Sequence, residues 1–310
     1  MENKTLFSTI PKLNQLKHFL VIIDFAEIEE VTFLNVFNKQ KILARRLIES
    51  RDDILAAPVK GQISHIHLII SEDSYERNEL EATLDSLKLI LNGPFFLPYI
   101  VYLRAIHFTL NVKLSDEWNE VQNYFVKSDK FLKTKEILQS VRVHLFITDA
   151  SLGVCAYGLR LKLPEISLSD LGVDIDKFYS TGFAETKKTV YTLPDFKSAT
   201  ALGVYMNLPN TGPFKEYSDL RNYWKIVYGY PLPENEEGMV YVDVTFGWNS
   251  ITYVYPIICL FPYEPLPFKS KMPFESIYGF LETVERKFPK ICGHPLNIRT
   301  KARSFLSLSF

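Results

Sequence analysis

The sequence lacks the short motifs that identify the common enzyme and nucleotide-binding classes. It contains no GxxxxGK[ST] phosphate loop and no GxGxxG turn after a strand, and it lacks GxSxG, HExxH and paired CxxC patterns. We therefore assign no catalytic, cofactor-binding or metal-binding residue, and we expect no cofactor. An enzyme whose site has diverged from these patterns stays open as the third of three functional hypotheses.

Charge of one sign, cysteine and long apolar runs are also scarce. The 35 basic and 36 acidic residues leave a net charge of −1, so no overall field draws the chain to nucleic acid or anionic lipid. The three cysteines, Cys155, Cys259 and Cys292, are widely spaced, which is typical of free thiols in a reducing compartment. No apolar run approaches the roughly 20 residues of a membrane helix, and the first residues do not form a signal peptide. We expect an intracellular protein, cytoplasmic or nuclear, with no membrane partner.

Apolar and aromatic residues are abundant, at 47% and 14% of the 310 positions. That content suffices for one large core or two medium ones. Strand and helix patterns mix irregularly and hairpin patterns recur, so the sequence predicts an α+β fold with mixed or largely antiparallel sheets and packed helices. The polar stretch 164–188 is the candidate boundary between an N-terminal α+β half, residues 1–165, and a C-terminal α+β half, residues 186–310. One continuous module is the alternative.

Strand-like patterns occur along the whole chain. They predict strands at 18–25, 62–70, 99–114, 141–148, 154–163, 189–193, 202–208, 239–246 and 251–258. The fourth strand pairs with the fifth, and the eighth with the ninth, as hairpins. Pro256 places the last strand at a sheet edge or a bulge.

Helical spacing of apolar residues predicts five helices. The first follows a stripe through residues 33–55, and the second begins at a capping box of Asp73 and Glu76 and ends near residue 91. A third begins after Ser115 and carries Trp118 and Val121. The remaining two cover residues 218–228 and 273–288.

The segment YSDLRNYWKIVYGYPLP, residues 217–233, concentrates four Tyr and one Trp. Leu220, Tyr223, Trp224, Val227 and Tyr228 recur at helical spacing after the N-cap candidate Ser218. A platform for stacking bases would place its aromatic rings on an open face among Lys and Arg side chains. The helical stripe favours a buried core face instead.

Three segments resemble a known family. DILAAPVKG at 53–61, YSDLRNYWKIVYGYPLP at 217–233 and KFPKICGHPLNI at 287–298 are similar, in order and approximate spacing, to the uncharacterised vertebrate family labelled chromosome 18 open reading frame sixty-three, a domain of unknown function. The similarity runs over nearly the entire chain. The resemblance favours one module and implies no activity or catalytic residue.

Histidines and a cysteine are the candidates for metal or nucleophile chemistry. His65 and His67 share one face of a predicted strand, a spacing that metal ligands use, but two ligands do not complete a site, so we expect no metal. Cys292 and His294 could pair a thiolate with an imidazole. The Gly and Pro residues around them favour a tight structural turn.

Two basic clusters are candidate nucleic-acid contacts. One interleaves lysines with Phe131, and the other lies near the carboxyl end. A solvated surface is the alternative interpretation, which the near-neutral total charge favours. The residues are Lys127, Lys130, Lys133, Lys135, Arg299, Lys301 and Arg303.

The segment ARSFLSLSF at 302–310 is the candidate protein interface. Its four large apolar residues are Phe305, Leu306, Leu308 and Phe310, an unusual composition for a free polar tail. An extended segment of this kind can pair with a sheet edge of its own chain, near Pro256, or with a partner protein.

A large core in a sequence without a recognisable catalytic motif favours a non-enzymatic protein-interaction module or scaffold. The expected partner is a protein of unknown identity. The second hypothesis is a nucleic-acid-binding module that uses the Lys/Arg clusters, which salt-dependent binding to oligonucleotides would reveal.

Overall fold

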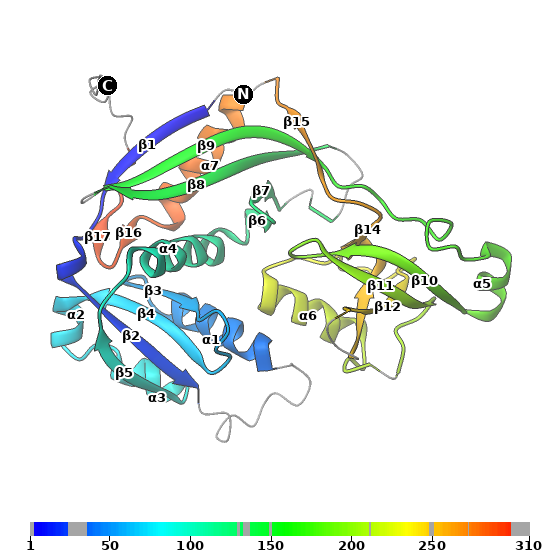
Figure 1. Cartoon of the computed structure of the whole chain (residues 1–310), viewed down its shortest axis with the longest axis horizontal. Helices are drawn as coiled ribbons and strands as arrows, with labels where there is room; N and C mark the ends of the chain where they lie inside the picture. Colours follow the sequence, from blue (N-terminus) through cyan, green and yellow to red (C-terminus); the bar gives the residue numbers. More distant parts are fainter. Residues whose placement is uncertain are drawn as a thin grey trace. The chain divides into compact units, whose positions relative to one another are not determined.

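The computed structural model describes residues 3–23, 36–128, 131–132, 137–148, 151–210, 212–247, 251–271 and 273–298. The fold is α+β, with antiparallel sheets and packed helices, as the sequence predicted (Figure 1). Two compact units are present: one draws on Met1–Trp118, Val141–Gly158 and Met272–Phe310, and the other on Asn119–Ser140 and Leu159–Lys271. These units interleave along the chain. The division into two consecutive folding halves stays a prediction.

Unit 1 is built on a four-stranded antiparallel sheet. Its order is β3 (Ile54–Pro58), β4 (His65–Ser71), β2 (Leu16–Ile23) and β5 (Leu89–Phe95). Helices α1 (Val36–Ser50) and α3 (Glu81–Ser86) contribute side chains to the core on one face of this sheet. Core side chains with no exposed surface include Val21, Leu47, Ile48, Ile66 and Leu68. Full burial of such side chains stabilises the fold by about 1.5–3 kcal/mol each.

The longest segment predicted to be a strand forms a helix instead. Residues expected to form a strand at 99–114 form α4 (Tyr99–Leu114), which begins after Pro98. Its buried residues, among them Tyr102, Ala105 and Leu110, recur at helical spacing, but Tyr99 and Ile100 are apolar and exposed, so the sequence alone shows no clear amphipathic pattern. Its Ile, Val, Thr and aromatic residues are typical of strands, and tertiary packing overrides that preference.

Two predicted helices are also wrong in part or in whole. The segment from Asp73 to residue 91 divides into α2 (Glu72–Glu76), α3 and the beginning of β5. The segment after Ser115 forms the short strands β6 (Trp118–Val121) and β7 (Tyr124–Lys127). Apolar residues spaced by three or four positions predicted helices here, but four-residue strands are too short for the alternation to distinguish the two structures.

The remaining part of unit 1 packs α7 against neighbouring strands. Strand β1 (Asn3–Thr9) pairs antiparallel with β9 (Ser151–Lys162), the neighbour of β8 (Leu138–Thr148). In α7 (Pro273–Lys287), the ring of Phe280 meets Trp118 edge-on, and the Trp118 indole donates a hydrogen bond to Thr283 at 3.2 Å. The predicted strands of β8 and β9 and the predicted helix of α7 are confirmed. Three short elements complete the unit: the 3-10 turn Leu13–Gln15, β16 (Lys290–Ile291) and β17 (His294–Pro295).

Unit 2 is built on a five-stranded antiparallel sheet. Its order is β13 (Thr252–Pro256), β12 (Tyr241–Thr245), β11 (Lys197–Tyr205), β10 (Phe183–Thr192) and β14 (Leu260–Phe261). The second predicted hairpin, β12 with β13, is confirmed, and Pro256 does lie in an edge strand. Three further elements are α5 (Ile175–Thr181), the 3-10 turn Ile257–Cys259 and β15 (Leu266–Lys269), which pairs with β9.

The aromatic segment forms α6 (Tyr217–Tyr228), and its stripe is buried as expected. Trp224 is 2% exposed and lies among Leu220 and other residues of the unit 2 core. The helix has Glu216, not Ser218, as its N-cap, and Gly229 ends it in the left-handed conformation with φ 75°. The stacking-platform alternative for this segment is therefore wrong.

The part of the chain that the structure describes contains no helix with both the length and the apolar character needed to cross a membrane.

Candidate interaction surface

Five exposed large apolar residues of unit 1 lie in β5, in the segment after it and at the start of α4. We call the residues Ile90, Phe95, Phe96, Tyr99 and Ile100 the β5–α4 surface. Phe96 is 83% exposed, and the other four are 44–55% exposed. Because β5 ends the strand order of its sheet, its outer side pairs with no strand among the residues described. Open backbone groups beside exposed apolar side chains are the features that strand-adding partners use.

A local irregularity in the pairing of β5 with β2 places these side chains. The register shifts between His18 and Leu20, and Gly93 takes φ +133° at the corresponding point of β5. A Cβ on Gly93 would lie 3.1 Å from ring atoms of both Phe19 and Phe95. The bulge therefore depends on glycine.

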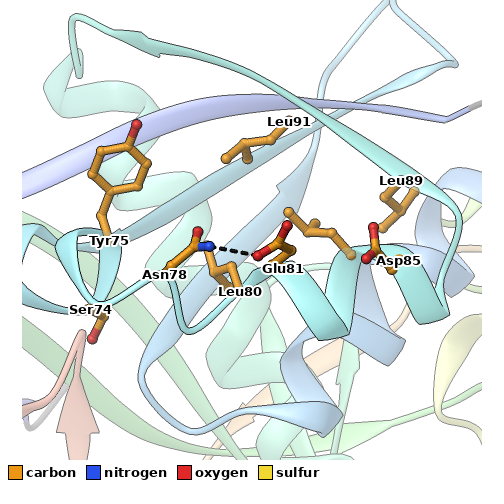
Figure 2. A pocket seen from close by; sticks show the side chains of 9 residues that line it. Ser74, Tyr75, Asn78, Leu80, Glu81, Asp85, Leu89 and Leu91 are labelled. Atoms are coloured by element: carbon orange, nitrogen blue, oxygen red, sulfur yellow. Dashed lines mark hydrogen bonds between the residues drawn. The ribbon is translucent and has the colours of Figure 1, made fainter.

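A groove of about 230 Å³ lies beside β5, between this strand and helices α2 and α3. Figure 2 shows side chains from both sides reaching into it. We call it the α2–α3 groove, and its lining residues are Ser74, Tyr75, Asn78, Leu80, Glu81, Leu84, Asp85, Leu89 and Leu91. The groove thus combines leucine side chains with two carboxylates on one side of α3. Its volume is below the roughly 300–1,000 Å³ of a small-molecule site, and it has room for only one or two side chains.

A charged clamp fixes the segment that carries the groove. The Arg51 guanidinium contacts Asp53 at 2.7 Å and Glu79 at 2.9 Å, and the Ser74 hydroxyl donates to Asp53 at 3.1 Å. Hydrogen bonds from Arg51 hold the pKa of Asp53 below its ordinary value. Ser71 caps α2 by accepting from the Ser74 backbone N–H. The groove wall is consequently anchored to the sheet at the start of β3.

Within α3, Glu81 and Asp85 are one helical turn apart. Both are exposed, and both side chains extend from α3 toward the space below β5 in Figure 2. The Asn78 amide donates to the Glu81 carboxylate at 2.6 Å, which orients one of the two.

A chain of hydrogen bonds ties Phe96 to the sheet. The His18 ring contacts the Phe96 carbonyl at 3.0 Å through Nδ1 and His67 Nδ1 at 3.1 Å through Nε2. A carbonyl only accepts, so His18 Nδ1 carries its proton, and a neutral His18 then accepts from His67. Burial lowers the pKa of both rings, that of His67 to about 4, and favours the neutral pair. The pair therefore holds the backbone of the β5–α4 surface in place.

The histidines considered as metal ligands have different neighbours. His65 contacts Ser64 at 2.9 Å, whereas His67 contacts His18. Among the described residues, no three His, Cys, Asp or Glu side chains are grouped closely enough to hold a metal ion. Antiparallel pairing of β2 with β4 brings His18 and His67 together, a contact that no local sequence pattern indicates. The absence of a bound metal stays a prediction.

The cysteines are free thiols. Cys292 is 1% exposed in the turn between β16 and β17 and donates to the Ile69 carbonyl at 3.6 Å. Burial raises the pKa of this thiol above its ordinary value, so it stays protonated and is a poor nucleophile. His294 is exposed at the start of β17. These observations favour the structural interpretation of this segment.

Most residues of the basic clusters and of the carboxyl-terminal segment lie outside the described residues. Lys127 is exposed at the end of β7. Phe131, the aromatic residue between the lysines, is fully buried and packs edge-on against Tyr230, with ring centroids 5.0 Å apart. It is therefore not a stacking residue. The positions outside the description are Lys130, Lys133, Lys135, Arg299, Lys301, Arg303, Phe305, Leu306, Leu308 and Phe310.

The β5–α4 surface was not among the sites predicted from the sequence. The predicted helix ended near residue 91, the next predicted strand began at residue 99, and no element was assigned to the residues between them. The available signal was the run FFLPYI at 95–100, in which five of six residues are large and apolar or aromatic. Two adjacent Phe residues point to opposite sides of an extended chain, and one of them tends to stay exposed.

The geometry defines an α+β protein with an exposed sheet edge beside a small acidic groove. The chain belongs to the family described as a domain of unknown function (DUF4708), whose model matches residues 3–268.

Among solved structures, the chain is similar to Argonaute proteins at low scores. For Marinitoga piezophila Argonaute with 5′ OH guide RNA and target DNA, the identity is 10%, the TM-score is 0.32, and 91% of this chain and 35% of that chain are covered. For Kluyveromyces polysporus Argonaute with a guide RNA, the identity is 15%, the TM-score is 0.27, and 92% and 38% are covered. The chain thus spans little more than a third of these proteins. At such scores the likeness carries no functional argument.

Proposed function

We propose that this protein is a non-enzymatic, intracellular protein-interaction module that binds an extended segment of a partner protein along the outer edge of β5. The observation that carries the proposal is the β5–α4 surface, where exposed apolar side chains adjoin an edge strand. A strand added there would gain backbone hydrogen bonds from β5 and apolar contacts from Ile90 and Phe96. The free thiols support a reducing location, cytoplasmic or nuclear. We also propose that the family is the vertebrate chromosome 18 open reading frame sixty-three family.

Site-specific photocrosslinking tests the proposal. A benzoylphenylalanine in place of Phe96, in the full chain expressed in cells, should capture a defined partner. The same probe in place of Tyr278 on α7, which is 54% exposed, is the matched control and should not capture that protein. Addition of the purified partner should then slow amide exchange across residues 89–95. Identical capture at both positions, or unchanged exchange in β5, would contradict the proposal.

The carboxyl-terminal apolar residues Phe305, Leu306, Leu308 and Phe310 form a second candidate element for recognition. Deletion of residues 304–310 separates the alternatives. A lower melting temperature of the isolated protein indicates docking on its own sheet. Unchanged stability with lost partner capture indicates recognition.

The nucleic-acid hypothesis rests on the Lys/Arg clusters, from Lys127 to Arg303. It predicts oligonucleotide binding that weakens steeply with salt, and its loss when the lysines and arginines are changed to Gln. A divergent enzyme remains the third hypothesis.

A further inference from the structure

The α2–α3 groove has an excess of negative charge on the wall that faces β5. Residues 72–85 contain six acidic residues and one basic residue, Arg77. The acidic residues are Glu72, Asp73, Glu76, Glu79, Glu81 and Asp85. Such a segment has a local potential that the near-neutral whole chain does not reveal.

Two of these carboxylates line the groove and have no cationic partner among the residues that the structure describes. Glu72 pairs with Lys17, and Glu79 pairs with Arg51 and Arg77. Glu81 and Asp85 form no ion pair with any described residue, and they lie beside Leu89 and Leu91 of β5. A cation entering the groove would therefore meet two open carboxylates above an apolar floor.

The geometry of strand addition directs alternate side chains of a partner toward this groove. Successive side chains of an added strand point to opposite faces of the sheet. One set would lie over the groove, on the face of Leu89 and Leu91, and the other would lie on the face of Ile90. Because the groove holds one or two side chains, a single long side chain is the natural occupant.

We propose that the partner segment recognised at β5 carries an arginine or lysine whose aliphatic stem lies on the leucines of the groove and whose cation lies between Glu81 and Asp85. This inference rests on the proposed function and specifies the chemistry of its partner. Arg suits the site better than Lys because its planar guanidinium presents several N–H donors and can contact two carboxylates at once. The flanking positions of the partner are apolar or β-branched, which fits the exposed Ile90.

Fluorescence anisotropy with labelled nine-residue Val/Thr peptides and the full chain tests this proposal. The central residue is Arg, Lys, citrulline or Glu, where citrulline has the shape of Arg without its charge. At low salt the Arg peptide should bind about three- to tenfold tighter than the citrulline peptide, as expected for a partly exposed ion pair with two carboxylates. Raising NaCl from about 0.05 M to about 0.5 M should remove most of the difference.

Matched variants locate the effect. Glu81→Gln with Asp85→Asn should weaken binding of the Arg peptide and abolish its preference over the citrulline peptide. Asp73→Asn with Glu76→Gln removes two charges from the same segment outside the groove lining and should preserve most of the preference. Melting temperatures confirm that each variant is folded.

The outcomes separate the two proposals. Equal affinity for Arg and citrulline peptides, with all binding lost in Phe96→Ser, overturns the basic partner and leaves the edge-binding function intact. An Arg preference that survives Glu81→Gln with Asp85→Asn places the cation elsewhere and also overturns the inference. Failure of every peptide to bind the folded protein contradicts strand addition at β5 and the inference with it.

Discussion

The α6 stripe of unit 2 and the β5–α4 surface of unit 1 both consist of large apolar and aromatic residues, but they differ in solvent exposure. Trp224 on α6 is 2% exposed, whereas Phe96 after β5 is 83% exposed. Helical spacing puts the α6 aromatics on one face, where a sheet can cover them. Phe95 and Phe96 are adjacent in an extended chain, so they cannot share a face. Aromatic content alone therefore does not distinguish a core from a binding surface; spacing and local structure do.

The largest expected effect tests the buried side of this comparison. Trp224→Ala should lower the free energy of unfolding by about 3–5 kcal/mol because it empties a large aromatic site. The ring lies against Tyr255 and Tyr230, with centroids 5.4 and 6.1 Å away. Denaturant unfolding measures the change. Trp224→Phe should cost clearly less, and an unaltered midpoint in the Ala variant would show that α6 does not stabilise its unit.

The second largest loss of stability is expected on removal of Arg51, which forms the charged clamp beneath the α2–α3 groove. Arg51→Met leaves the partly buried Asp53 without its cation and should cost about 1–3 kcal/mol. The pKa of Asp53 is lowered in the folded protein, so its stabilisation is present above the unfolded pKa and disappears as the pH falls through the folded value. The variant should therefore lose less stability on acidification than the wild type does. Arg77→Met is the control, because it removes an exposed partner of the same Glu79. An equal loss of stability in this control would contradict a stabilising role of the Arg51–Asp53 contact.

The histidine pair gives a smaller effect that depends on pH. His67 has a folded pKa of about 4, below the ordinary 6.5, so protonation favours the unfolded chain. The stabilisation from the neutral His67 ring is complete above about pH 6.5 and is lost as the pH falls toward 4, and solvent screening of the partly exposed ring keeps the loss small. His67→Gln should flatten the stability profile in this window. Parallel profiles for variant and wild type in urea titrations would contradict the prediction.

The smallest effect on stability tests the exposed side of the comparison. Phe96→Ser should change the free energy of unfolding by no more than about 0.5 kcal/mol because the ring is already in solvent. The same change should remove partner capture at β5. Calorimetry on the purified protein, together with the crosslinking described above, measures both. A loss comparable to that of Trp224→Ala would mean that the Phe96 ring is part of the core.

The elements that were predicted correctly from the sequence are those with one face in the core and one face in solvent. The helices α6 and α7 and the hairpin β12–β13 were predicted because each has an apolar face and a polar face. Helix α4 was not, since apolar residues such as Tyr99 and Ile100 are exposed while others such as Tyr102 are buried, so its sequence does not separate an apolar face from a polar one. The apolar run around Phe96 is evident in the sequence. Its position on the surface follows only from the structure, in which α4 begins at Tyr99.

The sequence by itself determined the α+β class, the buried aromatic stripe and the free thiols, because local periodicity and composition carry that information. Only the tertiary structure decided which residues meet across the chain. Pairing of β2 with β4 joins His18 to His67, which are 49 positions apart. Strand β5 is an edge strand because it is the last in the order of its sheet. The groove between α3 and β5 likewise exists only after a segment expected to be one helix has divided into two helices and a strand. Long-range contacts of this kind depend on packing free energy summed over many residues, and no single segment encodes them.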